Sequence, residues 1–217
     1  MAQGCSEAPS ASYTPAALRE GSRSPLASMG RPAPLTSDSN EIMTVTVEEL
    51  VEALQAKLVT VGVLDVRTDK EHAGGRITGA VHETCETLLD SDQGDERSKA
   101  LLEGFSKGGK ETVVVHCMYS QARGPAVVQL LNTIAREHCG DLKVMLLEGG
   151  FHKFFNTVCD AEGGAAHVPG LLENIDKSCW RLTKTHGWVE ADAVEGLEAL
   201  GVEVDAVSSA GAASASG

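Results

Sequence analysis

The sequence predicts an α/β fold in which a parallel sheet carries helices on both faces, with disordered N- and C-terminal tails. Between residues 42 and 158, short β-branched or apolar runs alternate with helix-length segments, and glycine-containing turns separate them. Residues 1–41 hold five of the seven prolines and no Val, Ile, Phe or Trp, and the last ten residues are only Ser, Ala and Gly. Such segments bury too little apolar surface to offset the entropy of ordering them.

Three parts of the chain are therefore expected. These are a disordered segment at 1–41, a catalytic domain at 42–158, and a C-terminal extension at 159–217. Residues 189–217 carry six acidic and no basic side chains. A helix within 189–204 is an alternative there, because its apolar residues have rough helical spacing, but the composition favours a solvated tail.

The first half of the domain is predicted as strand, helix, strand and loop. Residues 42–45 are a β-branched strand, and Thr46 and Glu49 form a capping box that begins a helix reaching residue 58. Residues 59–66 are a nearly continuous apolar run, which is typical of a strand covered on both faces. Residues 67–83 contain three glycines and are predicted as loop, with a short strand at 80–82.

The second half repeats the alternation. Helices are predicted around 96–105, at 124–138 and at 151–158, and strands at 112–116 and 144–147. Glycine pairs at 108–109 and 149–150 separate these elements. In open parallel sheets the ligand site lies beyond the carboxyl ends of the strands, so the loops there should carry the chemistry.

Charge and composition exclude several classes of function. The 217 residues include 18 Lys+Arg and 31 Asp+Glu, a formal charge of −13, which disfavours a nucleic-acid partner. No apolar run reaches about 18 residues, so no membrane span is expected. The six cysteines include no Cys-x-x-Cys pair, which suggests a reducing cytoplasmic or nuclear setting and no metal site. Organellar targeting by residues 1–41 stays an alternative, and a monomer is expected.

The segment HCMYSQARGP, residues 116–125, follows the most strand-like pentapeptide and opens a helix. Cys117 and Arg123 are separated by five residues, a length that lets the backbone N–H groups curl around one oxyanion. Arg123 can bind two oxygens of that anion. The N–H groups, the helix N-terminus and Arg123 together favour a Cys117 thiolate, so the same loop binds the anion and activates the nucleophile. A buried structural cysteine beside a capping arginine is the alternative that the coincidence of strand, loop, Gly124 and Pro125 disfavours.

This loop resembles the active-site loop of the rhodanese-fold phosphatases, namely the M-phase-inducer dual-specificity phosphatases and the related eukaryotic arsenate reductases. Three further segments support the resemblance: LDVR at 64–67, GRITGA at 75–80 and LEGGF at 147–151. It covers residues 42–158 and implies a single rhodanese-like domain. The oxyanion-binding loop then comprises Met118, Tyr119, Ser120, Gln121, Ala122, Arg123 and Gly124, with Cys117 and Arg123 catalytic and His116, Asp65 and Arg67 supporting.

The resemblance implies hydrolysis of phosphate monoesters on protein tyrosine or dual-specificity sites, without metal or cofactor. Arsenate reduction with glutathione as co-substrate, together with glutaredoxin, is the alternative, and a non-catalytic binding module is a third. Sulfur transfer is disfavoured because the sulfurtransferases of this fold have a loop one residue shorter. The substrate is expected to be a phosphoprotein or a small oxyanion.

Two positions depart from the family pattern. Ala122 stands where the large mitotic phosphatases typically have Glu, and neither Gln121 nor Ala122 can protonate a leaving group. Asp65 and Glu148 are candidate acids, although a solvated or structural carboxylate is the favoured interpretation of each. Val66 stands where several relatives carry a second cysteine, so a resolving thiol would come from glutathione or from another cysteine: Cys85, Cys139, Cys159 or Cys179. Cys139 is interpreted as structural.

Overall fold

The computed structural model describes residues 41–159 and 170–204. The disordered segment predicted at 1–41, apart from Glu41, and residues 205–217 therefore lie outside the described residues. The secondary structure elements, in chain order, are β1 (Thr44–Val45), α1 (Val47–Gln55), β2 (Val61–Asp65), α2 (Asp69–Ala73), β3 (Arg76–Ile77), β4 (Val81–His82), α3 (Cys85–Leu88), α4 (Gly94–Lys107), β5 (Thr112–His116), α5 (Arg123–His138), β6 (Lys143–Leu147), α6 (Gly150–Val158), β7 (Leu172–Glu173), the 3₁₀ turn η2 (Lys177–Cys179), β8 (Trp180–Thr183), β9 (Gly187–Glu190) and α7 (Ala191–Ala199).

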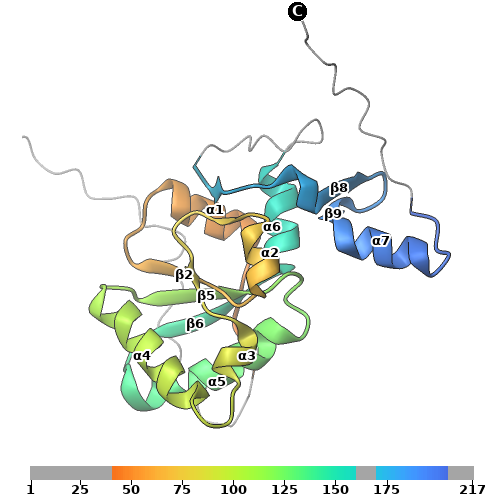
Figure 1. Cartoon of the computed structure of the whole chain (residues 1–217). Coiled ribbons are helices and arrows are strands. Elements are labelled where there is room, and N and C mark those ends of the chain that lie inside the picture. Colours follow the sequence, from red (N-terminus) through yellow and green to blue (C-terminus); the bar gives the residue numbers. More distant parts are fainter. Residues whose placement is uncertain (1–40, 160–169, 205–217) are drawn as a thin grey trace, which may run out of the picture. The chain divides into compact units, whose positions relative to one another are not determined.

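A five-stranded sheet in the order β1-β6-β5-β2-β4 forms the centre of the domain, and all of its pairings are parallel. Helices α1 and α6 lie on one face, and α3, α4 and α5 lie on the other (Figure 1). This confirms the predicted parallel sheet with helices on both faces. The carboxyl ends of β2 and β5 are neighbours, since Asp65 pairs with His116.

The central strands are buried because helices cover both of their faces. Every residue of β2 is buried, and so are residues 113–116 of β5. A hydrophobic cluster fills the space between the sheet and helices α3, α4 and α5. Its members with no exposed surface are Leu64, Val66, Leu88, Leu102, Val113, Val115, Val127, Val128, Leu131 and Val144. Cys117 and Cys85 belong to the same cluster, so the candidate nucleophile is packed against the hydrophobic core.

The capping box predicted at the first helix is present. The Thr46 hydroxyl accepts a hydrogen bond from the Glu49 backbone N–H, and the Glu49 carboxylate accepts one from the Thr46 N–H. The strand predicted at 59–66 is shorter, at 61–65, because Val59 is 76% exposed and precedes the covered part of the sheet.

Residues 67–83 are not the simple loop that their glycines suggested. They contain α2, whose N-cap Thr68 forms a second capping box with Glu71, and the short strand β3. The helix has only five residues, too few for the apolar periodicity that identified the others. The same holds for the four-residue helix α3.

The solvated tail favoured for residues 189–204 is wrong for most of that segment. Strands β8 and β9 form an antiparallel hairpin, and α7 follows directly at 191–199. Trp180, Ala191 and Val194 are each at most 5% exposed, so this segment has a small buried face of its own. Strand β7 also pairs with β3, which ties the extension to the turn after α2.

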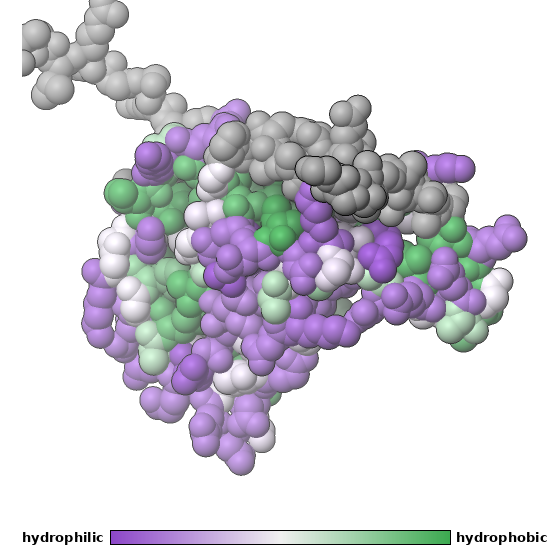
Figure 2. Space-filling model, turned by 45° about the horizontal axis from the view of Figure 1, so that its top comes forward, coloured by the Kyte–Doolittle hydropathy of each residue, from purple (hydrophilic) through white to green (hydrophobic). Residues whose placement is uncertain are grey.

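Hydrophilic residues occupy most of the face shown in Figure 2, with hydrophobic residues in patches between them. Among the described residues, no helix is both long and apolar enough to cross a bilayer.

Candidate active site

The segment Asp65-Val66-Arg67 forms a buried clamp at the end of β2. Both charged side chains have no exposed surface. Nε and Nη2 of Arg67 donate to the Asp65 carboxylate at 2.9 and 2.6 Å, and Nη2 also donates to the Gly75 carbonyl oxygen at 2.7 Å. The guanidinium lies 3.8 Å from the centre of the Phe151 ring in α6. Arg67 therefore links three parts of the fold: β2, α6, and the turn that follows α2.

Asp65 is unsuited to the role of a leaving-group acid. Burial alone would raise its pKa, but the charge of His116 and the hydrogen bonds and charge of Arg67 outweigh burial and lower the pKa to about 2. The carboxylate has no surface that a substrate could reach. Asp65 is thus a structural anion in the clamp.

His116 is the last residue of β5 and is completely buried. Its Nδ1 lies 3.9 Å from Oδ1 of Asp65, and its ring stacks on Phe151. Burial is the largest cause that lowers the pKa of His116 to about 4, and nearby Arg67 lowers it further. The imidazole is therefore neutral at physiological pH. It packs beneath the loop, between the end of β5 and Phe151.

Cys117 follows β5 directly and is 2% exposed. The backbone N–H of Ser120, a residue with a left-handed φ of 53°, points at the Cys117 Sγ at 3.2 Å. The carbonyls of Cys117 and Met118 accept hydrogen bonds from Phe151 and His152 at the start of α6, at 2.9 and 2.8 Å. A trans peptide unit directs its N–H opposite to its carbonyl, so the N–H groups that follow these two carbonyls point away from α6. Among the loop N–H groups, that of Ser120 is the one directed at the thiol, and the convergence of the others on one anion stays a prediction.

Two glycines make this arrangement sterically feasible. A Cβ on Gly150 would lie 2.6 Å from the carbonyl oxygens of both Cys117 and Met118, and its φ of +61° favours glycine as well. A Cβ on Gly124 would lie 2.9 Å from Leu146 in β6. The sequence motifs Arg-Gly-Pro and Gly-Gly-Phe therefore mark places where backbone must approach closely.

Arg123 is the first residue of α5, and it is paired with a residue that the sequence analysis did not single out. Its Nη1 and Nη2 donate to the two carboxylate oxygens of Glu71, both at 2.6 Å. The hydrogen bonds to Glu71 raise the pKa of Arg123. Burial would raise the pKa of Glu71, but the bonds from Arg123 and Thr68 outweigh burial and lower it. This bidentate pair fixes the plane of the guanidinium and leaves three of its five N–H groups for a ligand.

The remaining residues of the predicted loop differ in their exposure. Gln121 and Ala122 are exposed, Met118 is fully buried, and Tyr119 is 38% exposed with its ring against His152. Glu148, the other candidate acid, lies on an exposed turn and pairs with Lys153 at 2.8 Å, so it faces solvent.

The C-terminal extension contacts the site through α2. The indole N–H of Trp180 donates to the Gly74 carbonyl oxygen at 2.9 Å, and its ring stacks on Phe155 with centroids 4.3 Å apart. Lys70 in α2 forms an ion pair with Asp192 in α7. Glu190, between these contacts, is half-buried beside the site. No local pattern marked this role, because the paired residues are more than 100 positions apart.

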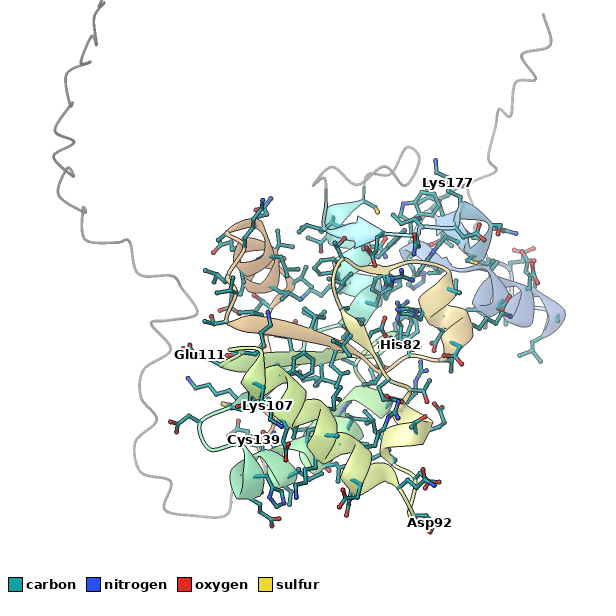
Figure 3. The ribbon with its side chains drawn as sticks, turned by 60° about the vertical axis from the view of Figure 1, so that its left-hand side comes forward. His82, Asp92, Lys107, Glu111, Cys139 and Lys177 are labelled. Carbon is teal, nitrogen blue, oxygen red and sulfur yellow. The ribbon has the colours of Figure 1, made fainter. Side chains whose placement is uncertain are left out.

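The cysteines differ in their distance from the loop. Cys85 shares the buried cluster with Cys117, and its backbone N–H donates to the carbonyl of Val66, the residue beside the loop. Cys139 is the C-cap of α5, at the far end of the helix from Arg123. Figure 3 shows it near Lys107 and well separated from His82, which hydrogen-bonds the Arg67 carbonyl oxygen. Within 41–159 and 170–204, no group of three or more His, Cys, Asp or Glu side chains could hold a metal ion.

The chain thus combines a parallel sheet, covered by helices on both faces, with the Cys117–Arg123 loop at the end of β5. The model of the rhodanese-like domain family matches residues 46–157, and the chain belongs to that family. It is 32% identical over 98 residues to "Dual specificity phosphatase ibp1" of Schizosaccharomyces pombe, a match that covers 45% of this chain and 64%, less than two thirds, of that protein.

Relatives of a second kind also match. The chain is 34% identical over 95 residues to "Arsenate reductase 2.2" of Oryza sativa subsp. japonica, covering 42% of this chain and 67% of that one. Among solved structures, it is similar to Ygr203w of Saccharomyces cerevisiae, described as a homolog of single-domain rhodanese and the Cdc25 phosphatase catalytic domain. That similarity has a TM-score of 0.52 and 25% identity, and it covers 67% of this chain and 97% of the other.

Proposed function

We propose that this protein hydrolyses phosphate monoesters, with protein phosphotyrosine or dual-specificity sites as its substrate class. The observation that carries the proposal is the loop itself, with a thiol at its base, the Ser120 N–H directed at that thiol and Arg123 as the first residue of α5. A loop with five residues between Cys and Arg can surround a tetrahedral dianion, and the helix N-terminus adds positive potential behind it.

The reaction proceeds in two displacements. The Cys117 thiolate attacks phosphorus, the S–P bond forms, and the bond from phosphorus to the ester oxygen breaks as that oxygen takes up a proton. Water then attacks the cysteinyl-phosphate, which releases inorganic phosphate and regenerates the thiolate. Arg123 and the loop N–H groups stabilise the equatorial oxygens as charge develops on them. This chemistry requires neither a metal ion nor a cofactor.

Glu71 contributes to the site by orienting Arg123. Its two carboxylate oxygens accept hydrogen bonds from Nη1 and Nη2 of Arg123. Arg123 is thereby held in one rotamer, and its other N–H groups are free to bind a ligand. Because Glu71 also caps α2 through Thr68, the orientation of Arg123 is coupled to the fold of the segment after β2.

Arsenate reduction is the second candidate, and the similarity to a plant arsenate reductase supports it. Arsenate would bind in the same loop and form a thiol-arsenate adduct on Cys117. Two glutathione thiols, oxidised to one disulfide with the help of glutaredoxin, would supply the two electrons that convert arsenate to arsenite, and one arsenate oxygen would leave as water. This route needs no acid for an alcohol leaving group, because arsenate exchanges its oxygens readily.

For both routes we propose a monomer acting on a phosphoprotein or small oxyanion in a reducing compartment, the cytoplasm or nucleus. Cys85, Cys117, Cys139 and Cys179 are free thiols, which supports the reducing setting.

A paired assay tests the proposal. Aryl-phosphate hydrolysis and glutathione-dependent arsenite production are measured on the full chain, on Cys117→Ser and on Cys139→Ser. We expect phosphatase turnover that Cys117→Ser abolishes and Cys139→Ser, a thiol at the far end of α5, leaves unchanged. Arsenite production without phosphatase turnover would establish the second candidate instead. Residual turnover in Cys117→Ser would refute the nucleophile.

A further inference from the structure

The proposed phosphatase mechanism needs a general acid for the leaving group, and the candidate acids within residues 42–158 are unsuited to that role. An alcohol or phenol leaves poorly as an anion, so a carboxylic acid near the loop mouth is expected to protonate it. Asp65 is buried and ionised, Glu148 faces solvent with Lys153, and Glu71 is held by Arg123 with a lowered pKa. None of these three can deliver a proton to a substrate in the loop.

Two other carboxyl groups interact with the charge of Arg123: Glu86 in α3, which is exposed, and Glu190 in the C-terminal extension, which is half-buried. Glu190 is the last residue of β9 and lies opposite Trp180 in the hairpin, and Trp180 is anchored on the Gly74 carbonyl at the end of α2. Two residues later, Asp192 pairs with Lys70 of α2. Contacts on both sides thus hold Glu190 against the helix that carries Glu71.

The Glu190 side chain is not used to hold the fold. Glu190 is the N-cap residue of α7, yet its carboxylate makes no capping hydrogen bond. Across the described residues, no hydrogen bond or ion pair to this carboxylate is present, although the residue is half-buried. A carboxyl group in this state is available to a substrate.

The surroundings of Glu190 favour its protonated form. Burial is the largest cause that raises its pKa, followed by the negative charge of Glu71, while Arg67 and Arg123 oppose the rise without cancelling it. A phosphate dianion in the loop would add further negative charge nearby. The charged and titratable groups that act on Glu190 or are acted on by it are Glu71, Arg67, Arg123, Asp192, Lys70 and Tyr119.

We propose that Glu190 is the general acid of the phosphatase reaction and donates its proton to the ester oxygen as the P–O bond breaks. This inference rests on the proposed function. In the first displacement the proton passes from the Glu190 carboxyl group to the leaving alkoxide or phenoxide. In the second, the resulting carboxylate accepts a proton from the water that attacks the cysteinyl-phosphate, which restores the acid. The substrate then binds between the loop and the β9–α7 junction, next to Tyr119 at the rim.

The test compares two leaving groups on the full chain. p-Nitrophenyl phosphate releases a stable phenolate and needs little protonation, whereas phenyl phosphate releases a poor leaving group. For Glu190→Gln we expect kcat for phenyl phosphate to fall by about 10²-fold, and kcat for p-nitrophenyl phosphate to fall by less than about fivefold. The fall in kcat of the full chain at high pH, measured with phenyl phosphate, should also disappear in this variant.

Glu198→Gln is the matched control, because it removes one negative charge from an exposed position of the same segment, α7, and Glu198 is not among the groups that act on the proposed acid. It should leave the ratio of the two kcat values unchanged. Equal losses on both substrates in Glu190→Gln would indicate a structural role and overturn the proposal, as would no loss on either. If the unaltered protein hydrolyses neither ester, the proposed function itself fails, and the acid assignment fails with it.

Discussion

The β5–α5 loop and the C-terminal extension meet at the same site but are built in different ways. The loop follows a strand that is buried over residues 113–116, its outer carbonyls are bonded to α6, and Cys117 is 2% exposed. The extension is held by the β3–β7 pairing, by the buried indole of Trp180, by the hydrogen bonds between Asn156 and Trp188, and by the Lys70–Asp192 ion pair, whose side chains are 79% and 65% exposed. The loop is thus built from residues adjacent in the chain, and the extension is attached through residues far apart in it; in the proposed mechanism the loop binds the anion and the extension delivers the proton.

The loop side of this comparison is tested most strongly at Arg123. Arg123→Lys keeps a positive charge but cannot bind two oxygens of an anion or pair with both oxygens of Glu71. We expect kcat/KM for p-nitrophenyl phosphate to fall by about 10³-fold. Arg136→Lys, at the other end of α5, is the control and should leave kcat/KM unchanged. A loss below about tenfold would mean that the N–H groups alone suffice.

The extension side is tested at Trp180. Trp180→Ala removes the stacking on Phe155 and the hydrogen bond to Gly74, and we expect the free energy of unfolding to fall by about 3 kcal/mol in urea denaturation. Leu200→Ala, at an 80% exposed position, should change it by less than about 0.5 kcal/mol. In the folded Trp180→Ala variant, phenyl phosphate activity should fall more than p-nitrophenyl phosphate activity. If the two activities fell equally, the docking of the extension by Trp180 would not be needed for proton delivery.

His116, which is buried beneath the loop, makes the free energy of unfolding depend on pH. Its pKa is about 4 in the folded protein against 6.5 ordinarily, so between these values the unfolded chain binds a proton that the folded chain does not. The contribution of neutral His116 to the free energy of unfolding is therefore fully present above about pH 6.5. This contribution falls by about 3 kcal/mol as the pH drops to about 4. Urea titrations at several pH values should show a smaller slope for His116→Asn than for the unaltered chain. His138→Gln, on a partly exposed residue, should keep the full slope.

Glu71 joins the two regions and should show the smallest effect. Glu71→Gln keeps a side chain that can complete the capping box but loses the charge that holds Arg123. We expect kcat/KM for p-nitrophenyl phosphate to fall by about tenfold. Glu49→Gln makes the same change in the capping box of α1, away from the site, and should have no effect. If both variants lost activity equally, the effect would belong to helix capping and not to Arg123.

The sequence was sufficient to predict the parallel sheet and the Cys117–Arg123 loop, because both depend on residues close together in the chain. A buried strand, a glycine for close approach and a helix start follow one another within residues 112–125. The residues around the loop mouth could not be found in this way. Glu71 lies 52 positions from Arg123, and Trp180 lies 106 positions from Gly74, so only the folded chain brings them together.

One signal was nevertheless present and unused. Thr68 and Glu71 repeat the spacing of Thr46 and Glu49, which identified α1 correctly. Applying the same rule to residues 67–83 would have placed a helix N-terminus immediately after the β2 clamp. For α7 the acidic composition was the misleading signal, and the rough helical spacing of its apolar residues, which favoured the alternative of a helix, was the correct one.

The amino end of α6 would affect how the loop binds the proposed oxyanion. Since Phe151 and His152 already hold the outer carbonyls of Cys117 and Met118, and Gly150 alone permits that approach, the loop is preorganised before any ligand arrives. Little conformational entropy should then be lost when an oxyanion binds. A side chain introduced at Gly150 would damage binding from behind the loop, without touching any group that contacts the ligand.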